Sequence, residues 1–215
     1  MIIAGRNVET LEHVKQSLLE EHTGRKVDSL SIDVTDESSV VNFFQIIQQN
    51  YGGVDLLVNN AGISIAGDAE SLSADQLRKV LDVNVTGAFL CSREALKQMK
   101  TKEGGRIINI GSISAYSPRP NSVAYTTSKF ALDGLTKSLS LDARDHNIAV
   151  GVIQPGNVMS QMLSAEEVER RSKLEGFMDP SDVADCVLTM ASLPYSTNLL
   201  EMTVIPTTMP FVGRG

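Results

Sequence analysis

The chain has 215 residues, enough for one domain with a substantial core. Its formal net charge of −7 and its pI near 5.0 argue against nucleic acid or an anionic membrane as the main partner. The two cysteines, Cys91 and Cys186, stand far apart without metal-ligand spacing, so we expect free thiols and no metal site.

Short apolar runs alternate with helical patterns along the chain. The runs typical of strands cover residues 1–5, 27–33, 54–59, 106–110, 147–154 and 200–205. The helical patterns cover residues 8–19, 36–51, 77–99, 125–144 and 180–191. This alternation predicts an α/β fold, a Rossmann-like doubly wound parallel sheet with helices on both faces. Because no linker divides the chain, we expect residues 1–215 to form one domain.

Compartment can be predicted from what the sequence lacks. No apolar run approaches the roughly 18 residues that a membrane span needs. The first residues carry neither a basic segment nor a small-residue cleavage site typical of a signal peptide. Unpaired cysteines also fit a reducing compartment, so we expect a cytoplasmic protein without a membrane partner.

Three side chains around the strand at 106–110 suggest proton chemistry. Tyr125 and Lys129 lie four residues apart, so they share one helix face. A free phenol has a pKa of about 10, and a neighbouring ammonium group is expected to lower it towards neutrality. Ser112 follows the strand, where open α/β sheets place their ligands. Its hydroxyl can hold a carbonyl or alcohol oxygen beside the phenol, which predicts proton transfer at that oxygen.

These residues belong to a longer series of motifs. The segment Asn59-Asn60-Ala61-Gly62 and Asn84 precede them, and Pro155-Gly156 follows. With these spacings the chain resembles the short-chain dehydrogenases/reductases from residue 1 to about residue 208. The resemblance implies that Tyr125 is the general acid and base, that Lys129 lowers its pKa and binds the nicotinamide ribose, and that Ser112 polarises the substrate oxygen. It also makes Asn84 the fourth catalytic residue, holding a water that resupplies protons.

The resemblance also implies a set of cofactor contacts. Asn59, Ala61 and Gly62 would border the adenosine half, although an ordinary turn is the alternative interpretation. After the strand at 147–154, the nicotinamide side would be bordered by Pro155, Gly156, Val158 and Ser160, in addition to Tyr125 and Lys129. The side chains of Met159, Met162 and Leu163 would begin either a mobile apolar lid over the substrate or plain helix core.

The choice between NAD and NADP rests on the end of the strand at 1–5. A preference for NAD usually requires a carboxylate on the ribose 2′-OH, whereas an arginine suits the 2′-phosphate of NADP. Arg6 stands at this position, so we expect NADP(H) as the cofactor. Asp33 and Val34, at the end of the next strand, are expected at the adenine edge.

The family pattern places a glycine-rich turn, which binds the pyrophosphate, about 20 residues before the strand at 1–5. No such turn is present in this sequence. We therefore expected an N-terminally truncated member whose sheet is missing its first βα unit. Loss of two or three backbone contacts to the pyrophosphate would weaken cofactor binding by roughly 10²–10⁶-fold.

The leading functional hypothesis is an NADP(H)-dependent oxidoreductase that interconverts a carbonyl and a secondary alcohol by hydride transfer, with a small-molecule substrate. The alternative is a catalytically impaired short form that acts as an oligomerisation or scaffold subunit. Nucleotide-sugar epimerases and dehydratases share the Tyr-x-x-x-Lys pattern, but they carry a larger C-terminal portion than this chain. The resemblance further implies a homodimer or homotetramer that forms through the helices at 77–99 and 125–144.

Overall fold

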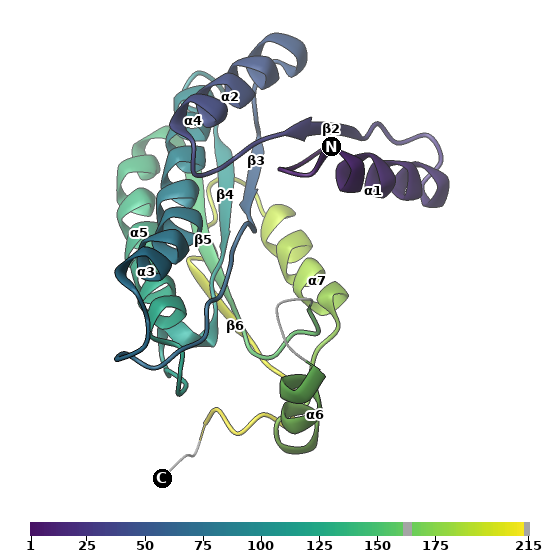
Figure 1. The fold of residues 1–215 in the computed structure, drawn as a ribbon. Coiled ribbons are helices and arrows are strands. Elements are labelled where there is room, and N and C mark those ends of the chain that lie inside the picture. Colours follow the sequence, from purple (N-terminus) through teal and green to yellow (C-terminus); the bar gives the residue numbers. More distant parts are fainter. Residues whose placement is uncertain (161–164, 213–215) are drawn as a thin grey trace.

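The computed structural model describes residues 1–160 and 165–212 of the chain. Strands and helices alternate along it, as expected (Figure 1). In chain order they are β1 (Ile2–Gly5), α1 (Val8–Glu21), β2 (Asp28–Ser31), α2 (Glu37–Tyr51), β3 (Leu56–Asn59), α3 (Ala74–Leu81), the π-helical turn η1 (Asp82–Gly87), α4 (Ala88–Met99), β4 (Gly105–Ile110), the 3₁₀ turn η2 (Ile113–Ala115), α5 (Val123–Ala143), the 3₁₀ turn η3 (Arg144–His146), β5 (Ile148–Pro155), α6 (Ala165–Leu174), α7 (Pro180–Ala191) and β6 (Glu201–Val204).

All strand pairs between these elements are parallel, which confirms the α/β fold class. β3, β4, β5 and β6 form a four-stranded sheet in that order, and β1 pairs with β2 in a separate two-stranded sheet. Parallel pairing brings the carboxyl ends of neighbouring strands to one edge of each sheet. Arg6, Ser112 and Gly156 follow those ends, at the edge where open α/β sheets bind their ligands.

The expectation that the first βα unit is missing is wrong. The chain begins with β1 followed by α1, and β1 pairs with β2 from Ile2↔Asp28 to Gly5↔Ser31. The lack of a glycine-rich turn suggested that the first βα unit is missing, but a different kind of turn connects β1 to α1. Asn7 is the helix N-cap and accepts a hydrogen bond from the Thr10 backbone N–H. The interpretation of the chain as N-terminally truncated rested on the same expectation, so it is wrong as well.

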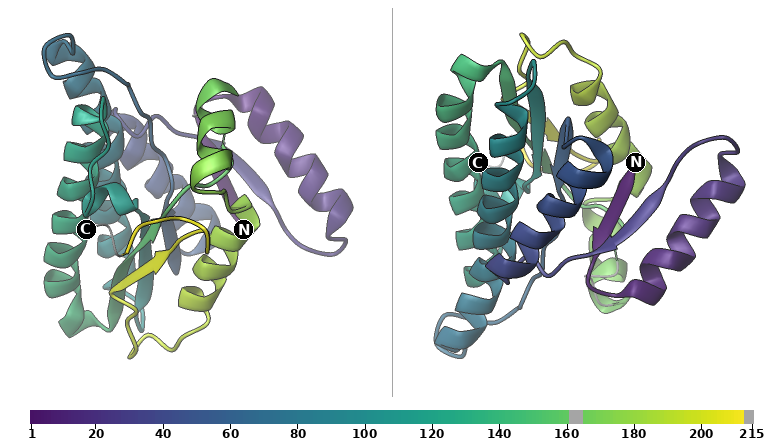
Figure 2. Two further views of the ribbon diagram at one scale, coloured as in Figure 1. Left: turned by 90° about the horizontal axis from the view of Figure 1, so that it is seen from below. Right: turned by 90° about the horizontal axis from the view of Figure 1, so that it is seen from above.

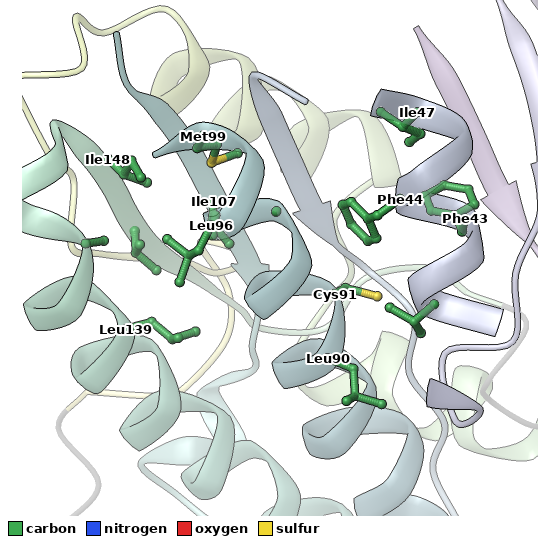
Figure 3. Close-up of a cluster of buried hydrophobic side chains, with 14 of the residues drawn as sticks. Phe43, Phe44, Ile47, Leu90, Cys91, Leu96, Met99, Ile107, Leu139 and Ile148 are labelled. Carbon is green, nitrogen blue, oxygen red and sulfur yellow. The ribbon is translucent and has the colours of Figure 1, made fainter. Parts of the chain in front are cut away.

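The main hydrophobic core lies between the four-stranded sheet and α2, α4 and α5 (Figure 3). Phe43 and Phe44 pack edge to face, with ring centroids 5.4 Å apart. Every residue of β5 is buried, as expected for a strand in a sheet covered by helices. A smaller cluster of Ile108, Ile153 and Met190 joins β4 and β5 to α7. α7 covers the face of the sheet opposite to α4 and α5 (Figure 2). Helices therefore cover both faces of this sheet.

Helix ends follow the local signals in the sequence. Ser73 and Gln76 form a capping box at the start of α3, and Asp179 caps α7 ahead of Pro180. α2 ends at Gly52, whose φ of 74° is left-handed. None of the helices in the described ranges is long and apolar enough to span a membrane.

The expected helix at 77–99 is not a continuous α-helix. It is divided into α3 and α4 by η1, which has π-helical geometry. Gly87 ends this turn where the backbone approaches the loop after β2, and a Cβ at that position would lie 2.8 Å from Val34 Cγ2. The π turn thus packs against the end of the two-stranded sheet.

Candidate active site

The described structure brings Ser112 and Tyr125 together. Ser112 follows β4 and is 9% exposed, while Tyr125 lies in the first turn of α5. The Ser112 hydroxyl lies close enough to the Tyr125 phenol to lower the pKa of that phenol. The Ser112 hydroxyl also accepts a bond from the Ser114 backbone N–H at 3.1 Å, which holds the small turn after the strand. A reacting oxygen placed here would meet two hydroxyl groups.

The Tyr125 phenol has a pKa above its usual value, contrary to the expectation. Burial is the largest cause and raises it, while the neighbouring Ser112 hydroxyl and the positive charge of Arg171 lower it. The spacing between Tyr125 and Lys129 indicated only that the ammonium group would be near. It did not reveal how far the phenol would be withdrawn from water. Tyr125 therefore carries its proton at neutral pH.

Lys129 lies one helical turn further along α5 and is buried, with only 6% exposure. Its Nζ lies 5.4 Å from the centroid of the Tyr125 ring and donates a 2.8 Å hydrogen bond to the Ile110 carbonyl. Burial lowers the pKa of Lys129 to about 8. A buried ammonium group next to a phenol is well placed to stabilise a phenolate when one forms.

Asn84 lies in the π turn, 2% exposed, and its amide faces protein groups. Its Oδ1 accepts from the Ile63 N–H at 2.8 Å, and its Nδ2 donates to the Ile63 carbonyl and to Ser128 Oγ, both at 2.9 Å. Asn84 therefore joins the loop after β3 to the residue next to Lys129. Its role in holding a water stays a prediction.

The Asn59-Asn60-Ala61-Gly62 segment follows β3 at the same edge. The Asn59 amide Nδ2 donates to Ser92 Oγ at 2.9 Å and to Asn109 Oδ1 at 2.8 Å. Asn109 in turn donates to Thr136 Oγ1 at 2.8 Å. These bonds tie β3 to β4, α4 and α5. Gly62 lies beside Asn84, since an added Cβ would be 3.5 Å from Asn84 Oδ1.

The residues expected to choose the cofactor meet at the end of the two-stranded sheet. Arg6 follows β1 and is exposed. Asp33 follows β2, and its Oδ1 accepts from the Thr35 N–H at 2.9 Å and from Thr35 Oγ1 at 2.7 Å. These bonds, and to a smaller extent the positive charge of Arg6, hold the pKa of Asp33 below its usual value. The structure thus places an ionised carboxylate near the guanidinium group, and Val34 beside them packs against Gly87.

The segment after β5 is held by backbone pairing. The Gly156 N–H donates to the Val204 carbonyl at 2.8 Å, and Val158 forms a parallel bridge with Met178. Pro155 closes the strand, Ser160 is the last residue before a gap in the described chain, and Met159 is 45% exposed. The lid positions Met162 and Leu163 lie outside the described residues. In the described ranges no group of three or more His, Cys, Asp or Glu side chains is arranged to hold a metal ion.

Sequence reasoning missed two polar clusters beside the site. Arg119, in the loop after β4, forms a 2.6 Å ion pair with Glu175, and both side chains bond to Asn157. Gln154, in β5, accepts a 2.7 Å hydrogen bond from the Ser112 backbone N–H. The available signal for Gln154 was a long amide side chain inside an otherwise apolar strand. The partners in both clusters are far apart in sequence, so local patterns could not pair them.

Comparison with known proteins shows the family of the chain. The family model described as short chain dehydrogenase matches residues 1–171. An uncharacterized oxidoreductase of Staphylococcus aureus is 31% identical over 206 residues, covering 96% of this chain and 86% of that protein. The crystal structure of NAD⁺-bound xylitol dehydrogenase superposes with a TM-score of 0.85 at 27% identity, covering 95% of this chain and 87% of that one.

A further solved structure supports the fold alone. The closed form of serine dehydrogenase complexed with NADP⁺ is 23% identical, with a TM-score of 0.87, and it covers 100% of this chain and 88% of that chain. The match to the family model extends over more than half of the sequence and begins with β1. The chain therefore belongs to the short-chain dehydrogenases, a family of NAD(P)-dependent oxidoreductases.

Proposed function

We propose that the protein interconverts a carbonyl compound and a secondary alcohol with NADP(H), and that Tyr125 is its general acid and base. The observation that supports this proposal is the proximity of the Ser112 and Tyr125 hydroxyl groups at the carboxyl edge of the sheet, with the buried ammonium group of Lys129 one turn away. Two hydroxyl groups and a cation suit a reaction that adds or removes a proton at an oxygen.

In the reducing direction, Ser112 donates a hydrogen bond to the carbonyl oxygen and fixes it beside the phenol. Tyr125 begins protonated because burial raises its pKa, and it gives this proton to the oxygen. When bound, NADPH would provide the hydride that the carbonyl carbon accepts. The resulting phenolate would be stabilised by Lys129, and a water held by Asn84 would resupply the proton. Oxidation reverses these steps, with the Tyr125 phenolate accepting the proton.

The donors at this edge fit a dinucleotide phosphate. Arg6 is exposed at the end of β1, where its guanidinium group can pair with a 2′-phosphate. The remaining contacts are assigned by resemblance to Asp33, Val34, Asn59, Ala61, Gly62, Pro155, Gly156, Val158 and Ser160. The two similar structures hold different cofactors, NADP⁺ in serine dehydrogenase and NAD⁺ in xylitol dehydrogenase. The preference for NADP(H) therefore rests on Arg6.

Titration of NADPH and NADH onto the wild type and onto Arg6→Ala tests the cofactor assignment. Loss of a charge-assisted bond of about 1.5–3 kcal/mol should weaken NADPH binding by roughly 10–100-fold and leave NADH binding unchanged. Arg25→Ala is the matched control, because Arg25 is also exposed and lies in the turn after α1. A preference for NADH in the wild type that persists in Arg6→Ala would refute the assignment. Failure of both cofactors to bind would favour the scaffold alternative.

We also propose that the protein is a homodimer or homotetramer, which pairs through α4 and α5. Phe89, Leu96 and Leu139 form an apolar groove between these helices, and Phe89 is 40% exposed. Leu141, near the end of α5, is 60% exposed. Sedimentation of the wild type should give a dimer or tetramer, and Phe89→Glu should give a monomer. A monomeric wild type at assay concentration would overturn this proposal.

A further inference from the structure

We propose that Gln154 is a positioning residue that fixes the Ser112 hydroxyl in register with Tyr125. This inference rests on the proposed function, since it assigns Gln154 a part in the same reaction. Gln154 lies in β5 one residue before Pro155, and it does not reach the reacting oxygen itself. Its side chain links the turn that carries Ser112 to the helix that carries Tyr125.

The contacts of the Gln154 amide define its orientation. Its Oε1 accepts the Ser112 backbone N–H at 2.7 Å, and its Nε2 donates to Asp133 Oδ1 at 3.4 Å. One neighbour is a backbone donor and the other is an acceptor oxygen, so exchanging the amide oxygen and nitrogen would lose both bonds. Gln154 is 0% exposed. A fully buried amide with both ends paired has a single favourable rotamer, which makes it a rigid link.

The turn before Ser112 is shaped to receive this side chain. A Cβ added to Gly111 would lie 2.1 Å from Gln154 Oε1, so the carboxamide occupies the space beside the glycine. The Gly111 N–H donates to the Ile153 carbonyl at 2.7 Å, which continues the pairing of β4 with β5. The backbone leading to Ser112 is thus supported by two consecutive bonds from β5. One comes from main chain and the other from the Gln154 side chain.

The other end of the link meets a column of residues on α5. Tyr125, Lys129, Asp133 and Lys137 follow one another at intervals of four, so they lie along one face of the helix. Asp133 pairs with Lys137 at 2.7 Å, which keeps its second oxygen engaged. Gln154 therefore joins Ser112 to the helix face that also carries Tyr125 and Lys129. Displacement of either end would change the separation of the two reacting hydroxyl groups.

The expected cost of breaking this link is kinetic. Reaction geometry must be held within about 0.5 Å, and such precision depends on supporting hydrogen bonds. Gln154→Leu has similar length but leaves the buried Ser112 N–H without an acceptor. We expect kcat to fall by roughly 10–100-fold, while the dissociation constant for NADPH stays within about twofold of the wild type. Asp145→Asn, on the exposed surface after α5, is the control and should retain wild-type kcat.

A charged variant gives a readout that a packing role would not produce. In Gln154→Glu the carboxylate can still accept from Ser112, but its second oxygen faces the Asp133 carboxylate. Burial and this like charge raise the pKa of the new acid, and its protonated form restores a donor towards Asp133. We expect kcat of Gln154→Glu, relative to the wild type at the same pH, to rise at least threefold from pH 8 to pH 6.

Exchange of the two partners supplies a rescue. In Gln154→Glu combined with Asp133→Asn, the amide lies on α5 and the acid on β5, so one donor again faces one acceptor. We expect this double variant to recover at least tenfold in kcat over Gln154→Glu at pH 8. Its kcat relative to the wild type should also lose the dependence on pH. No recovery would count against the link.

Failure of this inference differs from failure of the proposed function. If the wild type turns over and Tyr125→Phe does not, wild-type kcat in Gln154→Leu would overturn the positioning role alone. If the wild type shows no turnover with either cofactor, hydrogen exchange of the Ser112 amide provides the test. We expect Gln154→Leu to exchange this amide at least tenfold faster than the wild type, with the amides of α2 unchanged. Equal exchange rates at Ser112 would overturn the link.

Discussion

The two sheets of the molecule differ in how much of their surface is covered. In the two-stranded unit, α1 has no buried residue, and Val8 and Val14 are 64% and 40% exposed. In the four-stranded sheet, all of β5 is buried and α4 and α5 pack closely over the core. Figures 1 and 2 show β1, β2 and α1 standing apart from the larger sheet. Packing is therefore concentrated in one region.

The chemistry is divided between the same two regions. Ser112, Tyr125 and Lys129 lie on the packed sheet and its covering helix, whereas Arg6 and Asp33 lie at the end of the two-stranded unit. Groups that move a proton need fixed geometry, and the packed region provides it. Groups that select a cofactor act mainly through charge, which tolerates a less rigid support. We therefore expect changes in the packed region to affect rate and stability most.

The largest effect is expected at the phenol. Tyr125→Phe removes the proton donor and acceptor and should reduce kcat by roughly 10²–10⁴-fold. The fold and the affinity for NADPH should be retained, because the ring still fills its site. Tyr195→Phe is the matched control, since Tyr195 lies near Gly104 at the opposite end of β4. Steady-state kinetics with circular dichroism measure both outcomes, and substantial turnover by Tyr125→Phe would contradict the mechanism.

Truncation of one apolar side chain in each region measures the difference in packing. Phe44 is 2% exposed in the main core, so Phe44→Ala should reduce the free energy of unfolding by about 3–5 kcal/mol. Val14→Ala on α1 should change it by less than about 1 kcal/mol, because this side chain is already largely hydrated. Urea denaturation of the two variants provides the comparison. Equal losses would show that the two regions are packed alike.

The buried ammonium group should make stability depend on pH. The pKa of Lys129 is lowered from 10.5 to about 8 in the folded chain, so the unfolded state binds more protons between these values. The free energy of unfolding should therefore rise with pH across this window, by up to about 3 kcal/mol relative to Lys129→Met. Below pH 8 the folded chain bears the full free-energy cost of burying the charged ammonium group of Lys129. If the free energies of unfolding of the wild type and of Lys129→Met changed in parallel from pH 7 to pH 10.5, the lowered pKa of Lys129 would be contradicted.

The smallest effect is expected where the two regions meet. Gly87→Ala places a Cβ 2.8 Å from Val34 Cγ2 and should destabilise the chain by about 1–3 kcal/mol. Gly134→Ala on α5 is the control, because its Cβ would meet nothing within 4 Å. There the gain in helix propensity should stabilise by about 0.5–1 kcal/mol. Thermal denaturation separates the two, and equal midpoints would show that the contact between π turn and loop is not tight.

Local patterns predicted much of the fold. The alternation of runs located every strand of both sheets. Absence of a glycine-rich turn was a poor guide to the first βα unit, because Asn7 can begin a helix without glycines. The π turn around Asn84 could not be predicted, since it depends on contacts with Ile63 and Ser128 that are distant in sequence.

The candidate site was also predicted only in part, because some of its features depend on contacts between residues that are distant in sequence. The shared face of Tyr125 and Lys129 follows from helical spacing, and proximity to Ser112 follows from the parallel topology. The direction of the Tyr125 pKa depends on burial, which spacing does not report. The bond from Gln154 to Ser112 joins adjacent strands through a side chain, so only the three-dimensional arrangement reveals it.

The most direct test of the account follows a labelled hydride. The wild type and Tyr125→Phe would be incubated with NADPH deuterated at C4 on either face and with a panel of ketones, and the alcohol products analysed by mass spectrometry. The account predicts one deuterium on the carbinol carbon in the wild type, from one face of the cofactor only, and almost none in Tyr125→Phe. Equal transfer by the two proteins would contradict it, as would a wild-type alcohol product without the label.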